Sequence, residues 1–144
     1  MIRISVQVEP IDLAAEVAAI ELAGAVATFS GHVRADDGVS ALELQHYPGM
    51  TEAALTTLAQ EAAGRWALAG VTIVHRVGAM VPGDRIVLVA TAAPHRAAAL
   101  EACAALIDRL KTDAPFWKRE TRADGARWVE HRATDDAAAR RWNI

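Results

Sequence analysis

The sequence lacks the features that mark a secreted or membrane protein. Its single cysteine, Cys103, excludes a disulfide within the chain and is typical of a reducing compartment. No apolar run approaches the roughly 18 residues that a membrane-spanning helix needs, and the first ten residues contain no apolar segment of the kind found in signal peptides. We therefore expect a cytoplasmic protein with no membrane partner.

An excess of positive charge is also lacking, because 15 basic and 18 acidic residues give a formal net charge of −3. This balance argues against a nucleic-acid partner. The basic residues are unevenly spread, however, with seven of the fifteen between positions 109 and 132. Such a cluster is either a solvated, ion-paired surface or a pocket for a small anion, and composition leaves both interpretations open.

Motifs of several function classes are missing as well. The histidines, among them His46, His75 and His131, have no metal-ligand spacing, and one cysteine cannot build a zinc site. The sequence contains neither a nucleotide-binding glycine loop nor the motifs of a serine hydrolase. We therefore expect no metal and no tightly bound cofactor, and we expect Cys103 to lie in the core.

The apolar residues, which make up 53% of the chain, predict one domain over residues 1–144. Alternating or continuous apolar stretches predict strands at 2–8, 25–33, 41–47, 71–77, 85–91, 116–121 and 127–130. Helical periodicity predicts helices at 10–22, 51–66, 94–111 and 135–142. Turns at 35–38 and 124–125 predict hairpins, and 78–84 reads as a turn. This order favours an α+β fold with hairpins and a mixed or antiparallel sheet.

Lysine is scarce in this sequence. Only Lys111 and Lys118 occur among the fifteen basic residues, and the other thirteen are arginine. The pKa of a lysine ammonium falls on burial or beside other cations, and the amine can then act as a base or nucleophile, which arginine effectively cannot. The two lysines are therefore candidate catalytic residues, with two ordinary surface lysines as the alternative.

A second candidate site is the predicted helix start at Pro94, His95 and Arg96. A helix N-terminus offers unpaired N–H groups and the positive end of the helix dipole, so a cation is favoured there when an anion binds beside it. The pattern predicts phosphate binding, with an exposed first turn as the alternative. Arg34, at the end of a strand beside a turn, is a weaker candidate for a ligand contact.

Arg96 and Lys111 cannot reach one small substrate within a single chain. On one continuous helix their backbones are about 22 Å apart, because fifteen residues each add about 1.5 Å. Either the two residues serve different sites, or a symmetric dimer brings one end of this helix near the opposite end of its mate. We favour the dimer.

The segment LKTDAPFWKRE at 110–120 resembles the signature of the molybdopterin synthase catalytic subunits, roughly LKxxxPxWKxE. Further blocks match the family in order and spacing, and together they extend over nearly the whole chain. These blocks are GAVATFSGHVR at 24–34, HYPGMTE at 46–52, HRVGAMVPGD at 75–84, PHR at 94–96 and RWVE at 127–130.

The resemblance implies an α/β-hammerhead fold and a homodimer within a heterotetramer. A small ubiquitin-like subunit would insert its Gly-Gly tail into each catalytic pocket and supply sulfur from a C-terminal thiocarboxylate. Two sulfurs would be transferred to cyclic pyranopterin monophosphate, giving the dithiolene of molybdopterin.

The resemblance also implies roles for individual residues. Lys111 and Lys118 would be catalytic, beside the thiocarboxylate. Residues that would bind the anionic pterin or line its pocket are Arg34, His95, Arg96, Arg119, Glu120, His32 and Val33. The chain departs from the family pattern at His32, commonly a lysine or a small hydroxyl residue, and near Ala93, where serine is frequent. These departures bear on the hydrogen bonds to the pterin rather than on the reaction.

Two other classes of function remain as alternatives. The chain could be a non-catalytic module that docks a ubiquitin-like partner, or a sensor that binds a small anion through His95 and Arg96. The first would not need the lysines, and the second would not need a protein partner.

Overall fold

Two four-stranded sheets form the framework of the computed structural model, which describes residues 1–20, 23–129 and 133–142. Sheet A has the strand order β1-β4-β6-β2, in which β1 is parallel to β4 and the other pairs are antiparallel. Its strands are β1 (Ile2–Gln7), β4 (Gly70–Arg76), β6 (Arg85–Ala93) and β2 (Ala25–His32). Sheet B is antiparallel, in the order β5-β3-β7-β8. Its strands are β5 (Gly78–Met80), β3 (Ala41–His46), β7 (Phe116–Arg122) and β8 (Gly125–Val129). The predicted α+β fold with mixed and antiparallel pairing is confirmed.

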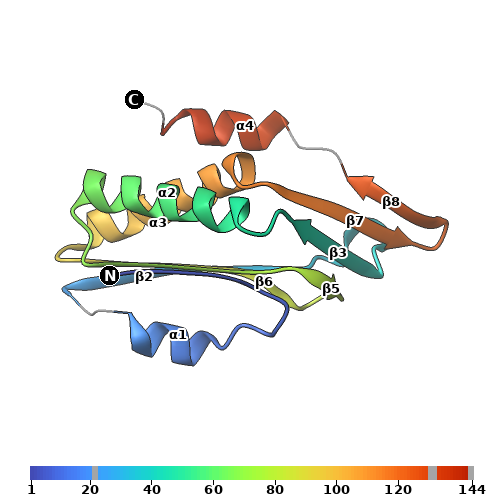
Figure 1. The fold of residues 1–144 in the computed structure, drawn as a ribbon, viewed down its shortest axis with the longest axis horizontal. Helices are drawn as coiled ribbons and strands as arrows, with labels where there is room; N and C mark the ends of the chain where they lie inside the picture. The colour runs from blue at the N-terminus through green and yellow to red at the C-terminus, as the bar shows by residue number, and fades with distance from the viewer. Residues whose placement is uncertain (21–22, 130–132, 143–144) are drawn as a thin grey trace.

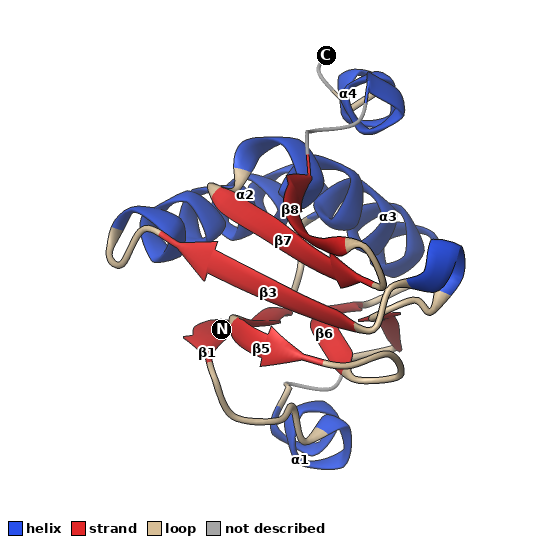
Figure 2. Ribbon diagram, turned by 90° about the vertical axis from the view of Figure 1, so that its right-hand side faces the viewer, coloured by secondary structure: helices blue, strands red, loops and turns tan. Residues whose placement is uncertain are grey.

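The helices cover both faces of sheet A. Helices α2 (Met50–Trp66) and α3 (Arg96–Asp113) lie side by side on one face, α2 over β1 and β4 and α3 over β2 and β6. The short α1 (Leu13–Ala19) lies on the opposite face (Figure 1). Sheet B extends beyond the ends of α2 and α3 (Figure 1) and lies in front of the two helices in Figure 2. None of the helices in the described part of the chain has both the length and the hydropathy to cross a membrane.

The largest core cluster fills the space between sheet A and the α2–α3 pair. Leu55 of α2, Leu106 of α3 and Ile73 of β4 are almost completely buried there. Each such side chain stabilises the fold by roughly 1.5–3 kcal/mol through removal of apolar surface from water. Cys103 belongs to the same cluster, so its predicted place in the core is confirmed. A second cluster lies where the two sheets meet, and its buried members are Val33, Leu42, Leu44, Val77 and Met80.

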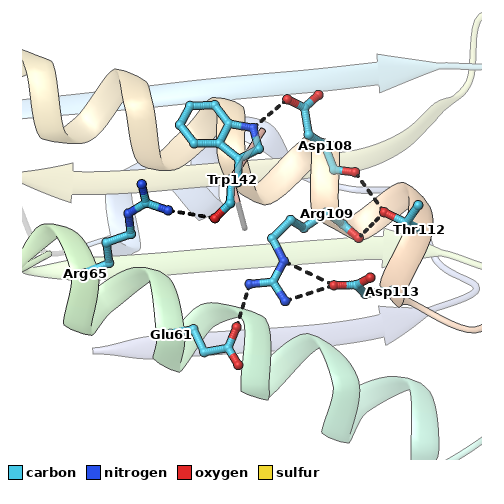
Figure 3. Close-up of polar contacts among 7 residues, drawn as sticks. All are labelled: Glu61, Arg65, Asp108, Arg109, Thr112, Asp113 and Trp142. Atoms are coloured by element: carbon cyan, nitrogen blue, oxygen red, sulfur yellow. Dashed lines mark hydrogen bonds and ion pairs between the residues drawn. The ribbon is translucent and has the colours of Figure 1, made fainter. Parts of the chain in front are cut away.

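The C-terminal helix α4 (Ala133–Arg140) lies over α3, and the residues after it fasten it there. The Trp142 indole N–H donates to Asp108 Oδ2 at 2.8 Å, and the Trp142 carbonyl accepts from Arg65 Nη1 at 2.9 Å (Figure 3). The Trp142 ring meets Trp66 edge-on, with centroids 5.9 Å apart. Two tryptophans thus act as packing anchors for the C-terminal residues.

The predicted hairpin between the second and third strands is wrong. β2 pairs with β6 in sheet A, whereas β3 pairs with β5 and β7 in sheet B. The chain leaves sheet A at Val33, whose N–H donates to the Asp84 carbonyl at 2.9 Å and whose side chain is buried between the sheets. A 3-10 turn at Asp36–Gly38 then leads into sheet B. The alternation of residues specifies a strand but not its partner.

Several element boundaries also differ from the predictions. The first helix begins at Leu13 rather than Pro10, because the Asp12 carboxylate accepts from the Ala15 N–H at 3.1 Å and caps it there. Its predicted end at 22 lies outside the described residues, as does the end of the last predicted strand at 130. The short β5 occupies part of the predicted turn at 78–84. His95 is the N-cap of α3, one residue after the predicted start.

Candidate functional site

The two lysines lie on either side of the junction between α3 and β7. Lys111 is in the last turn of α3, and Lys118 is the third residue of β7. The helix ends because Pro115 cannot continue it, and the Ala114 N–H closes the last turn on the Leu110 carbonyl at 3.2 Å. Both lysines are exposed. The positive charges of both act on one buried side chain, His75, so the two ammonium groups share a neighbourhood.

His75 is a site residue that our reading of the sequence missed. Its side chain is only 6% exposed, and its ring stacks on Phe116 with centroids 3.9 Å apart and planes 21° from parallel. The pKa of His75 is lowered from 6.5 to about 4, chiefly by burial. The hydrogen bond to the Arg76 carbonyl acts in the opposite direction, and the positive charges of Lys118, Lys111 and His46 add smaller lowering effects in that order. The ring is therefore neutral at pH 7. The sequence signal that could have identified it is a histidine at a core-facing position in an otherwise apolar row of a strand.

A buried hydroxyl fixes the backbone at the start of β7. Thr51 is completely buried, and its Oγ1 donates to the Pro115 carbonyl at 3.2 Å while accepting from the Tyr47 N–H at 3.1 Å. Both capacities of the hydroxyl are used, as a buried polar group requires. This hydroxyl thereby connects the start of α2, the end of β3 and the residue before β7, the strand that carries Lys118.

The side chains of β7 alternate between two faces of sheet B. Because successive strand residues point to opposite faces, Lys118 and Glu120 share the face of Phe116, and Arg119 shares the face of Trp117. Glu120 accepts from Arg122 at 2.7 Å. Lys118, Arg119 and Glu120 are all predicted site residues. The strand places Lys118 and Glu120 on one face and directs Arg119 to the other.

The other face of sheet B carries exposed aromatic side chains. Tyr47, Trp117 and Trp128 are 55%, 46% and 53% exposed, and the rings of Tyr47 and Trp117 are 5.7 Å apart. An open hollow of about 410 Å³ is formed here, which we name the aromatic hollow. Its lining residues are Gln45, His46, Tyr47, Pro48, Trp117 and Trp128. Contiguous exposed aromatic surface of this kind is typical of a binding surface.

Three predicted site residues lie where the chain leaves β2. His32 and Arg34 are exposed, and within the part of the chain that the structure describes Arg34 makes only a long contact of 3.8 Å to the equally exposed Asp36. An ion pair of this kind contributes little stability, so the guanidinium is readily available to an anion. Val33 is instead buried in the cluster that also contacts Phe116, and its backbone bonds to Asp84 and Gly83. It belongs to the framework that carries its two neighbours.

His95 and Arg96 lie at the opposite end of the molecule from Lys111. His95 is the exposed N-cap of α3, and the first turn that follows contains no acidic residue. The strand register agrees with this placement. Ala93, two residues before His95, pairs with Ala25 at one end of β2, whereas His32 pairs with Arg85 at the other end. Within one chain the structure therefore brings Lys111, Lys118 and His75 together and leaves His95 and Arg96 apart from them, as the helix length predicts.

The sequence matches a known protein family. Residues 6–113 match the family model described as MoaE protein. The molybdopterin synthase catalytic subunit of Ralstonia nicotianae is 50% identical over 151 residues, covering 100% of this chain and 86% of the relative. The chain belongs to the MoaE family. It is therefore a member of a family of enzymes, which the curated names identify as catalytic subunits.

Solved structures support the MoaE fold. A molybdopterin biosynthesis MoaE protein from Burkholderia ambifaria is 53% identical, with a TM-score of 0.86 and coverage of 100% of this chain and 99% of that one. A protein complex of subunits 1 and 2 of molybdopterin-converting factor from Helicobacter pylori is 20% identical, with a TM-score of 0.73 over 91% of each chain. At that identity the likeness concerns the fold alone. The fold that the resemblance implies is confirmed.

The only thiol of this MoaE-family chain lies away from the lysines. Cys103 is buried in the main core cluster, its Sγ 3.9 Å from the Val89 carbonyl. Burial raises the pKa of Cys103 to about 11, so it stays a protonated thiol at neutral pH. Among the residues that the structure describes, no group of three or more His, Cys, Asp or Glu side chains could hold a metal ion.

Proposed function

We propose that this MoaE-family protein is the catalytic subunit of molybdopterin synthase. It would convert cyclic pyranopterin monophosphate to molybdopterin by inserting two dithiolene sulfurs, each supplied by the C-terminal thiocarboxylate of a small ubiquitin-like subunit. The observation that carries the proposal is that Lys111 and Lys118, the only lysines of the sequence, lie on either side of the short junction between α3 and β7. We propose the cytoplasm as its compartment, in keeping with the single unpaired cysteine.

The chemistry requires proton transfer and charge stabilisation at the two lysines. Lys118 is suited to transferring protons as sulfur adds and oxygen leaves, because an ammonium beside a second cation loses a proton far more readily than a guanidinium does. Lys111 is suited to stabilising the charge near the carbonyl of the tail or to forming a transient adduct with it. The sulfur has to come from outside the chain, since Cys103 is buried and protonated. This supports a sulfur donor carried by a separate molecule, which the proposal takes to be the small subunit.

The aromatic hollow supports a protein partner. Tryptophan and tyrosine are enriched among the residues that dominate binding energy at protein interfaces. Trp117 precedes Lys118 on β7 but points to the opposite face of sheet B, so the Gly-Gly tail of a small subunit seated at the hollow would have to pass around the sheet to reach the lysines. Each transfer uses up one donor, and this interface therefore has to be exchangeable.

A homodimer would complete the pterin site. β2 is an edge strand of sheet A, and its length of about 23 Å, at roughly 3.3 Å per residue, is close to the Arg96–Lys111 separation. Two copies paired antiparallel along β2 would place His95 and Arg96 of the partner subunit near His32 and Arg34 of this chain. Four cationic or polar groups could then hold the phosphate of the substrate. Such a dimer forms the centre of the proposed heterotetramer.

The two alternatives account for fewer observations. A docking module that lacks activity would need the aromatic hollow but neither lysine, and an anion sensor would need Arg96 but no hollow. Only sulfur transfer uses the hollow, the lysine pair and the anion-binding residues together.

Conversion in vitro tests the proposal. The purified protein is mixed with cyclic pyranopterin monophosphate and a thiocarboxylated small subunit, and the oxidised pterin product is detected by its fluorescence. We expect product with the wild type, none with Lys118→Ala, and normal product with Arg140→Ala, an exposed cation on α4 that serves as the control. A stable complex with the small subunit that yields no product would support the docking module instead.

A further inference from the structure

His75 occupies a place where the strand pattern calls for an aliphatic side chain. Val71 and Ile73, the preceding residues on the same row of β4, are completely buried in the main core cluster. The cross-strand neighbours of His75 are Val6 on β1 and Val87 on β6. A polar ring in an apolar row costs stability unless it makes a specific interaction. The ring makes two interactions, of which the first connects it to the strand that carries Lys118.

The first interaction joins the two sheets. The His75 ring belongs to sheet A, and its stacking partner Phe116 is the first residue of β7 in sheet B. Phe116 and Lys118 share a face of β7, two residues apart. Thr51 holds the backbone at Pro115, directly before Phe116. The strand that carries Lys118 is thus fixed by its backbone on one side of Phe116 and by the aromatic stack at Phe116 itself.

The second interaction fixes the charge state and orientation of the ring. Nδ1 lies 2.8 Å from the Arg76 carbonyl oxygen, which can only accept, so Nδ1 carries the proton and donates it. The charged groups that act on the ring come from three elements, Lys118 of β7, Lys111 of α3 and His46 of β3. A positively charged ring near the two ammonium groups would repel them, and a neutral ring does not. An aliphatic residue would also be neutral but would lack the flat surface that matches Phe116.

We propose that His75 is a positioning residue for the sulfur transfer: its uncharged ring holds Phe116, and through it β7, so that Lys118 stands beside Lys111 at the reacting carbonyl. This inference rests on the function proposed above. His75 touches neither substrate nor sulfur in this scheme. Its effect appears in the turnover step rather than in the binding of the small subunit.

Kinetics of four variants test the role. His75→Phe keeps the stack, His75→Leu fills the space without a flat ring, His75→Ala removes both, and Ile73→Ala is a core deletion on the same row of β4. We expect kcat to fall at least tenfold in His75→Leu and His75→Ala with KM for the small subunit within about twofold of wild type. We expect His75→Phe to keep kcat within about threefold and Ile73→Ala to lower Tm while leaving kcat within about twofold. A folded His75→Leu with wild-type kcat, or a His75→Phe as slow as His75→Leu, overturns the positioning role.

A titration followed by NMR tests the coupling without any assay of activity. The imidazole signal of His75 is followed against pH in the wild type, in Lys118→Met and in Lys111→Met. Removal of either ammonium is expected to raise the pKa of His75, and unchanged values in both variants contradict the proposal. Wild-type protein that makes no product contradicts the proposed function instead, whereas an active wild type with a fully active His75→Ala contradicts only the positioning role.

Discussion

Arg109 links α3 to α2, because its Nη1 donates to Glu61 Oε2 at 2.6 Å (Figure 3). On α3, Arg109 lies within one helical turn of Lys111. The same guanidinium donates through Nε and Nη2 to Asp113 Oδ2 at 3.1 and 3.0 Å. Three hydrogen bonds from one side chain therefore hold the turn that presents Lys111. Part of the basic cluster is thus ion-paired surface, while Lys111 and Lys118 are its reactive part under the proposed function.

Replacement of Arg109 should loosen this turn at a modest cost. Glu61 is half exposed, so the network is partly screened by solvent, and Arg109→Met should lower the free energy of unfolding by about 1 kcal/mol. Urea denaturation measures this, with Arg140→Met as the control. Product formation should fall several-fold because Lys111 is less well held. Loss of stability with unchanged product formation would separate this network from the site.

Replacement of each lysine by arginine separates charge from proton transfer. Lys118→Arg keeps the positive charge but cannot give up a proton near neutral pH, so we expect product formation to fall by roughly 10²-fold or more. Binding of the small subunit, measured by calorimetry, should stay within about twofold of wild type. Lys111→Arg should be less damaging if charge alone is required there. Wild-type product formation in both variants would remove the lysines from the mechanism.

Trp128→Ala tests the aromatic hollow. Removal of a large exposed aromatic side chain from the centre of an interface typically costs 1–2 kcal/mol or more, so we expect the Kd for the small subunit to rise roughly tenfold or more. The fold should be unaffected because Trp128 is 53% exposed. Trp66→Phe, at the C-terminal end of α2 and outside the residues that line the hollow, is the control and should leave the Kd unchanged. If the Kd is the same for Trp128→Ala and the wild type, the small subunit does not dock at the aromatic hollow.

A mixing experiment tests whether each site is shared between two protomers. Neither Arg96→Ala nor Lys118→Ala should form product alone. A mixed dimer has one site in which Lys118 and the Arg96 of the partner subunit are both intact. Random exchange of equal amounts should therefore restore about a quarter of wild-type activity, since half of the dimers are mixed and each has one intact site of two. No recovery after exchange, verified by mass spectrometry of the dimers, would show that both residues act within one chain.

The stability of the protein should depend on pH through His75. Its pKa in the folded protein, about 4, lies below the ordinary value of 6.5. As the pH falls below about 6.5 the unfolded chain binds this proton first, so the free energy of unfolding decreases until the pH passes about 4. Between pH 7.5 and 4.5 the wild type should lose roughly 2–3 kcal/mol more than His75→Phe, whose carboxylates titrate as those of the wild type do. Equal losses in urea denaturation at the two pH values would contradict a buried neutral imidazole.

Much of the fold follows from local sequence patterns. The alternation at the start of the chain predicts β1, and the Asp124-Gly125 turn predicts the β7–β8 hairpin, which the register Arg122 to Gly125 confirms. The pairing of β2 and β3 could not be predicted, because their partners are set by the buried cluster around Val33 and Met80 at the junction of the sheets. β5 was missed since three residues are too few to show a period.

The candidate site was predicted unevenly for similar reasons. Lys111 and Lys118 stand out because the sequence uses lysine nowhere else. The separation of Arg96 from Lys111 follows from helix length alone. His75 was overlooked because its importance depends on Phe116, which is 41 positions away in the sequence and belongs to another sheet. Arg119 was grouped with its neighbours on β7, although strand alternation turns it to the opposite face.

Because its only thiol is buried, the chain should not react with thiol-alkylating reagents in the folded state. Cys103 is enclosed in the core, with its pKa raised to about 11, and offers no thiolate to an alkylating reagent at neutral pH. In an assembled complex, this subunit would therefore not compete for such a reagent with the sulfur on the proposed donor tail. A fluorescent alkylating dye could then count how many donors still carry their sulfur at each moment of the reaction, with no background from the catalyst.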